Sequence, residues 1–179
     1  MGIKKRRFQY DIAITALFVA IIIICSLVSI PFGTVPLTLQ LFGVITAAGL
    51  LKLKRGFFAV LLYILLGAMG LPVFHSFTGG VGVLMGSTGG YIFGFLLCAF
   101  VVGLFAKLKG RGFLSMLLAS TLGTAVCYTV GVLWYAIAFS NNQSIGAIIM
   151  TTVVPFLVFD FFKIIAASLV ISRVSKYVD

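Results

Sequence analysis

Residues 12–30 of the chain read IAITALFVAIIIICSLVSI, a run of 19 residues without a charge. A helix of about 20 apolar residues is long enough to span the hydrocarbon core of a bilayer. The basic residues from Lys4 to Arg7 before the run resemble the start of a signal peptide. The run is longer than the usual apolar region of such a peptide, and no Ala-x-Ala site followed by a polar domain comes after it. The stretch therefore predicts a first membrane span that is retained.

The composition of the whole chain agrees with this prediction. Of its 179 residues, 62% are hydrophobic and only 9% are charged, whereas an ordinary soluble domain has about 25% charged residues. At about 20 residues per span, the chain has room for six helices and short loops. A soluble catalytic or nucleotide-binding domain does not fit in this length.

The charges divide the chain into segments. Basic residues cluster at the N-terminus, at 52–55, at 107–111 and at the C-terminus, and long uncharged runs separate them. Loop signals rich in Pro, Gly or Asn interrupt these runs. We therefore predict a single all-α membrane domain, a six-transmembrane-helix bundle. Its expected spans are approximately 12–30, 36–51, 56–71, 89–106, 113–139 and 153–174.

In this arrangement all four basic segments fall on one side of the bilayer. The positive-inside rule makes that side cytoplasmic, so both termini are expected there. The net charge of +10 is then explained by topology, and the expected partner of the basic residues is the lipid bilayer, not nucleic acid.

Two charges do not follow this pattern. Asp160 and Lys163 stand three residues apart in the stretch Pro-Phe-Leu-Val-Phe-Asp-Phe-Phe-Lys, near the end of the sixth span opposite the basic segments. Residues at i and i+3 share one face of a helix, and charges inside a membrane are usually functional. One reading is an ion pair that only satisfies itself. The other is a polar clamp for a ligand, with Asp160 accepting hydrogen bonds and Lys163 donating them.

A glycine-rich stretch from Thr78 to Tyr91 precedes the fourth span. It contains no Gly-Lys-Ser/Thr and follows no strand, so we predict no nucleotide P-loop and no cofactor site in the chain. Glycines at a membrane boundary let irregular backbone line a cavity and approach a ligand. We expect Ser87, Thr88, Gly89 and Tyr91 to contribute to such a cavity.

Thr38 and Gln40 alternate with apolar residues at the start of the second span. Gln40 is expected to bind either a ligand or the backbone of a loop. His75 is more often a loop residue than a ligand, and Trp134 suits an interfacial belt or the lining of a cavity.

Small residues recur at helical spacing. One ridge runs from Gly86 to Cys98, a second from Ala119 to Gly131, and both favour close helix packing. In the first span, Ala13, Ala16 and Ala20 form a similar patch, which suits either packing within the bundle or docking of another subunit. The three cysteines have no metal-ligand spacing, so no metal site is expected.

The chain resembles the biotin-specific S-components of energy-coupling factor transporters. Three motifs carry the resemblance: Pro36-x-Thr38-x-Gln40, the glycine-rich segment from Gly79 to Phe95, and Pro155 through Asp160-x-x-Lys163. It implies an outward-facing cavity that captures biotin in the cytoplasmic membrane. It also implies a transmembrane coupling subunit, which the alanine patch would dock, and two cytoplasmic ATPase subunits that supply energy.

Three other functions remain open at this point. The chain would suit an S-component for another vitamin, such as thiamin or riboflavin. It would also suit a small intramembrane enzyme that uses Asp160 as acid or base, although no nucleophile–base pair is visible. The last alternative is a structural subunit that only supports an assembly.

Overall fold

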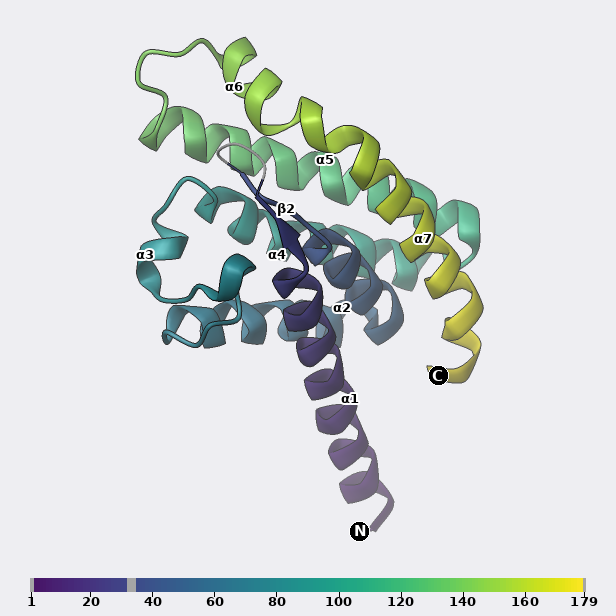
Figure 1. Cartoon of the computed structure of the whole chain (residues 1–179). Coiled ribbons are helices and arrows are strands. Elements are labelled where there is room, and N and C mark those ends of the chain that lie inside the picture. Colours follow the sequence, from purple (N-terminus) through teal and green to yellow (C-terminus); the bar gives the residue numbers. More distant parts are fainter. Residues whose placement is uncertain (1, 32–34, 179) are drawn as a thin grey trace.

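The computed structural model describes the chain at residues 2–31 and 35–178. Within these residues the fold is mostly helical, with seven α-helices, one short 3-10 helix (η1, His75–Phe77) and one two-stranded sheet (Figure 1). The α-helices are α1 (Gly2–Leu27), α2 (Gln40–Ala68), α3 (Val81–Leu84), α4 (Gly89–Leu108), α5 (Phe113–Ala138), α6 (Ile145–Thr152) and α7 (Val154–Val178).

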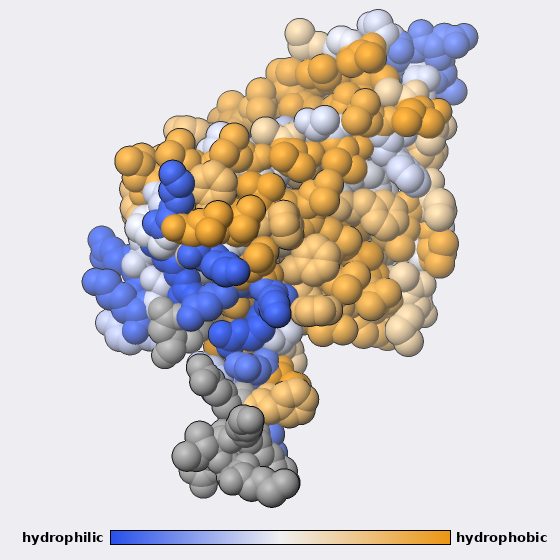
Figure 2. All heavy atoms as spheres, turned by 180° about the vertical axis from the view of Figure 1, so that it is seen from behind, coloured by the Kyte–Doolittle hydropathy of each residue, from blue (hydrophilic) through white to orange (hydrophobic). Residues whose placement is uncertain are grey.

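Four segments of the described chain are long and apolar enough to cross a membrane. They are residues Phe8–Leu27 of α1, all of α4 and α5, and residues Val154–Tyr177 of α7. Many large apolar side chains on the outside are exposed, and most of the surface in Figure 2 is hydrophobic. A water-soluble protein rarely exposes so much contiguous apolar surface, so this exterior is suited to lipid.

Helix α2 covers both the second and the third predicted span. Its backbone leaves the helical conformation at Lys52, where φ is 66°. A Cβ built on Gly56 would lie 2.6 Å from the Cα of Ala48, whereas eight residues of a straight helix rise about 12 Å. The chain therefore reverses direction near Lys52, and α2 consists of two halves that pack against each other. The total of six membrane spans and the cytoplasmic position of the termini stay predictions.

The structure differs from the predicted all-α fold between α1 and α2. The first helix ends at Leu27, and β1 (Ser29–Ile30) pairs antiparallel with β2 (Leu37–Thr38). Pro31 and Pro36 follow β1 and precede β2; proline lacks an N–H donor and disfavours helix in the residue before it. Two further short helices, α3 and α6, lie in segments that we had assigned to loops.

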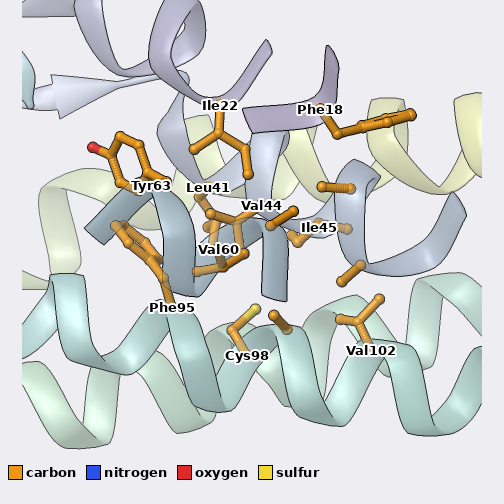
Figure 3. Packing of buried hydrophobic residues seen from close by; sticks show 14 of the residues in the cluster. Phe18, Ile22, Leu41, Val44, Ile45, Val60, Tyr63, Phe95, Cys98 and Val102 are labelled. Carbon is orange, nitrogen blue, oxygen red and sulfur yellow. The ribbon is translucent and has the colours of Figure 1, made fainter. Parts of the chain in front are cut away.

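The core lies where α1, both halves of α2 and α4 meet. Figure 3 shows Ile22 of α1, Val44 and Val60 of α2, and Val102 of α4 pointing toward one another. All four side chains have no exposed surface. These helices form the scaffold that holds the starts of α2 and α4 in place.

The two predicted ridges of small residues pack against each other. A Cβ on Gly94 would lie 2.9 Å from the sulfur of Cys127, and one on Gly123 would lie 2.9 Å from the sulfur of Cys98. Such distances leave no room for a methyl group. The prediction of tight packing is confirmed, and the contact joins α4 to α5.

Candidate functional site

A pocket lies where the starts of α2, α4 and α7 meet the second half of α5. The space between its walls, including the part open to solvent, is about 600 Å³. Small-molecule sites usually have a mostly apolar lining with a few polar groups. We call this site the paired-charge pocket. Its lining residues are Val35, Pro36, Thr38, Gln40, Leu41, His75, Thr88, Tyr91, Ile92, Phe95, Cys127, Tyr128, Thr152, Phe156, Asp160 and Lys163.

Asp160 and Lys163 form the charged part of this pocket. The Lys163 Nζ donates to Asp160 Oδ1 at 2.5 Å, and the Tyr128 hydroxyl donates to Asp160 Oδ2. The two charged residues are only 7% and 9% exposed. The two residues therefore pair with each other and also line a cavity. Their role as a clamp for a ligand stays a prediction.

This arrangement still has capacity for a ligand. An ammonium group has three donors, and each carboxylate oxygen has two lone pairs. One donor of Lys163 and one lone pair on each Asp160 oxygen are used by the contacts above. The remaining valences allow the pair to bind a molecule that has both donors and acceptors.

Gln40 has a structural contact that the sequence did not reveal. Its Nε2 donates to the Tyr63 hydroxyl at 2.6 Å, and that hydroxyl donates to Ser26 Oγ at 3.0 Å. The Gln40 backbone N–H also donates to Thr38 Oγ1. This buried chain of hydrogen bonds links α1 to both halves of α2 and fixes the side of the pocket where Gln40 lies.

Tyr91 is held between α5 and α6. Its hydroxyl donates to the carbonyl oxygen of Thr152 at 3.3 Å. A Cβ on Gly131 would lie 2.4 Å from the Tyr91 ring, so the ring packs directly on the backbone of α5. Glycine at position 131 thus allows Tyr91 to line the pocket.

A side-chain hydrogen bond from α5 holds the glycine-rich stretch. The Trp134 Nε1 donates to the carbonyl oxygen of Gly86 at 3.0 Å. Thr88 lines the pocket, whereas Ser87 and Gly89 are not among the lining residues. A Cβ on Gly89 would lie 1.8 Å from the carbonyl oxygen of Leu84, so this glycine permits the tight turn into α4.

Several lining residues were missed or given little weight in the sequence, among them Tyr128, Phe156 and His75. Tyr128 and Phe156 lie on predicted spans. The available signal for Tyr128 was its hydroxyl in an apolar run, four residues after Thr124, which indicates a polar contact inside the bundle. His75 lines the pocket mouth from η1. Partial burial lowers the pKa of His75 below its usual value.

Comparison with known proteins identifies the family. The BioY family model matches residues 4–179. The chain belongs to the BioY family. Among its relatives, the biotin transporter BioY of Thermotoga maritima is 44% identical over 160 residues, which cover 89% of this chain and 92% of the relative. A probable biotin transporter BioY of Pyrococcus horikoshii is 39% identical over 165 residues, covering 91% and 94% of the two chains.

A solved structure agrees with this membership. The crystal structure of the S-component for biotin from an ECF-type ABC transporter matches with a TM-score of 0.87 and 29% identity. The match covers 96% of this chain and 93% of that chain. Together with several apolar helices long enough to cross a membrane, the family makes this chain a multi-pass membrane protein.

Proposed function

We propose that this BioY member captures biotin as the S-component of an energy-coupling factor transporter, with the paired-charge pocket as its binding site. The observation that carries the proposal is the buried set of Asp160, Lys163 and Tyr128 in a pocket whose other walls are largely apolar. The relatives are named as biotin transporters and not as enzymes. These names argue against the alternative that the chain is an intramembrane enzyme that uses Asp160 as acid or base.

The polar and apolar groups of biotin match the polar and apolar lining of this pocket. Its ureido ring carries two N–H donors and one carbonyl acceptor, and its sulfur ring and aliphatic chain are apolar. With the ureido ring at the charged pair, Asp160 would accept from its N–H groups and Lys163 would donate to its carbonyl, and the apolar lining, which includes Ile92, Phe95 and Phe156, would pack on the rest of the molecule. Thr38, Thr88, Gln40 and Tyr91 supply further polar lining. Ser87 and Gly89 contribute by shaping the loop beside Thr88.

Two orientations of biotin satisfy Lys163. Either the ureido ring or the terminal carboxylate faces the charged pair. An amide of biotin, which lacks the carboxylate charge, distinguishes them. Unchanged affinity for the amide places the ureido ring at Lys163, and a large loss places the carboxylate there.

Mass spectrometry of small molecules that co-purify with the protein tests the choice of vitamin. We expect biotin to be found, and excess biotin to displace it where thiamin and riboflavin do not. Finding thiamin or riboflavin in its place would assign the chain to another vitamin. If no small molecule is retained and none of the three binds, the chain would instead fit a structural subunit.

We further propose that α1 docks the transmembrane coupling subunit, which works with two cytoplasmic ATPase subunits. Ala13, Ala16 and Ala20 are all exposed in the structure, so this small-residue face is not used for packing within the bundle. Ala16→Trp should block assembly with the coupling subunit and leave biotin binding intact. Leu118→Trp, at an exposed position of α5, is the matched control. Normal assembly of Ala16→Trp would remove this role.

The proposed topology has six spans in the cytoplasmic membrane, with the basic segments and both termini inside the cell. The native cysteines are buried, so single cysteines introduced at the surface report on topology. A membrane-impermeant maleimide applied to whole cells should label Asn142→Cys and not Lys109→Cys. Labelling in the opposite pattern would invert the proposed orientation.

A further inference from the structure

Tyr63 contacts a wall of the paired-charge pocket from outside. Gln40 lines the pocket, whereas Tyr63 is not among the described residues that line it. The Tyr63 side chain comes from the second half of α2 and has no exposed surface. Figure 3 shows its hydroxyl oxygen pointing away from the other labelled side chains. A buried tyrosine hydroxyl usually has hydrogen-bond partners, and those of Tyr63 lie on two different elements.

The Tyr63 hydroxyl connects the pocket to α1. It donates to Ser26 Oγ at 3.0 Å, near the C-terminal end of α1, and it accepts from Gln40 Nε2 at 2.6 Å. Ser26 and Gln40 are only 0% and 5% exposed, so solvent has little access to these bonds. The donors therefore follow one direction, from Gln40 to Tyr63 and from Tyr63 to Ser26.

This direction decides which end of the Gln40 amide faces the pocket. A tyrosine hydroxyl has a single hydrogen, and Tyr63 uses its hydrogen on Ser26. The hydroxyl can then only accept from Gln40, so the NH₂ group turns toward Tyr63 and the carbonyl oxygen turns away from it. Gln40 Oε1 takes part in no hydrogen bond of the described residues and is not among their fully buried polar atoms. This oxygen therefore stays available as an acceptor.

The ring of Tyr63 is held by the loop at the pocket mouth. It meets the ring of Phe74 edge to face, with the ring centroids 5.5 Å apart. Phe74 has no exposed surface and directly precedes His75, which lines the pocket. A Cβ on Gly67, one turn after Tyr63, would lie 2.1 Å from the Phe74 ring, so that ring packs directly on α2. These contacts restrict the Tyr63 ring and keep its hydroxyl in one position.

We infer that Tyr63 is a positioning residue of the paired-charge pocket, which holds the Gln40 amide with its carbonyl oxygen toward the ligand. The pocket then offers acceptors on Asp160 and Gln40, and donors on Lys163. This pattern favours a ligand group with two N–H donors and one carbonyl, as in a cyclic urea. The inference rests on the proposed function, in which biotin supplies this group.

A double-mutant cycle separates this role from packing. Tyr63→Phe keeps the ring and removes the hydroxyl, and Gln40→Met keeps the side-chain length without an amide. In the wild-type background, Tyr63→Phe should weaken biotin binding about 3- to 10-fold in calorimetric titration, the effect of one hydrogen bond. In the Gln40→Met background, Tyr63→Phe should change the affinity less than about twofold, because no amide is left to orient.

The control for the cycle is Tyr177→Phe, at the 85% exposed Tyr177 near the end of α7, which should keep wild-type affinity. An equal loss from Tyr63→Phe in both backgrounds would show that Tyr63 acts through packing alone, and would overturn the inference.

A second measurement needs no ligand. The chain has three glutamines, Gln9, Gln40 and Gln143. Labelling glutamine side chains with ¹⁵N therefore gives few NMR signals, and those missing from Gln40→Met belong to Gln40. Tyr63→Phe should shift these signals, because the NH₂ group loses the hydroxyl that accepts from it. Unshifted signals would overturn the inference whether or not biotin binds. A shift in a protein that does not bind biotin would support the position of the amide and contradict the proposed function.

Discussion

The charged residues at the two ends of the bundle differ in their surroundings. In the paired-charge pocket, Lys163 is neutralised by Asp160 at 2.5 Å, and both side chains are about nine-tenths buried. At the other end of the bundle, Lys52, Arg111 and Lys176 line a second hollow. A paired charge can be kept in a low-dielectric site and still bind a ligand with donors and acceptors. The cations at the other end follow the positive-inside pattern, which explains them by topology and needs no binding site.

The largest effect should come from breaking the pair. Asp160→Asn or Lys163→Ala leaves the other charge buried without its partner, and removal of one partner of a buried ion pair costs about 3–5 kcal/mol. We expect biotin affinity to fall by about 100-fold or more, measured by titration of purified protein. Lys107→Ala, at the basic end, should keep wild-type affinity. Affinity within a few-fold of wild type in both pair variants would separate this pocket from biotin binding.

A methyl group at the α4–α5 contact should distort the same pocket without changing charge. In Gly131→Ala, the new Cβ would overlap the Tyr91 ring, and such overpacking costs about 1–3 kcal/mol. We expect a lower thermal unfolding temperature and weaker biotin binding. Gly82→Ala is the control, because no atom lies within 4 Å of a Cβ built there. Equal unfolding temperatures and biotin affinities in the two variants would show that the contact can accommodate a methyl group.

Tyr128→Phe should have a smaller effect. The substitution keeps the ring and removes the hydroxyl that donates to Asp160 Oδ2. A hydrogen bond to a charged group contributes about 1.5–3 kcal/mol, so we expect biotin affinity to fall roughly tenfold. Since Lys163 still pairs with Asp160, the loss should be clearly less than in Lys163→Ala. A loss as large as that of Lys163→Ala would make Tyr128, and not the ion pair, the main polar contact.

The smallest effect should be seen on changing pH. Because partial burial lowers the pKa of His75, the folded protein favours neutral histidine. This contribution to stability is present above the ordinary histidine pKa and is lost as the pH falls through the lowered value. Between pH 7.5 and pH 5, wild-type protein should lose more thermal stability than His75→Gln. An equal loss in the two proteins would show that His75 titrates as an exposed group.

The comparison also shows what the sequence can predict. The charge pattern placed the helices well, because uncharged runs must be buried in lipid or protein: α5 at Phe113–Ala138 agrees with the predicted 113–139. The motifs led to Asp160, Lys163, Gln40, Thr38, Thr88 and Tyr91, all of which line one pocket. These residues were recognisable because polar groups are rare in an apolar chain.

Other contacts depend on distance in space and carry no local signal. Tyr128 lies 32 residues from its partner Asp160, and Gln40 lies 23 residues from Tyr63. The hollow at the other end of the bundle also escaped prediction, since the positive-inside rule explains its cations by topology. Only the folded chain shows that Lys52, Arg111, Ser175 and Lys176 line the same hollow.

Calorimetric titration of biotin into the purified wild-type protein in detergent tests the central claim most directly. The account predicts saturable, tight binding of one biotin per paired-charge pocket, competed by neither thiamin nor riboflavin. A folded protein that gives no binding signal with biotin at any accessible concentration would contradict it.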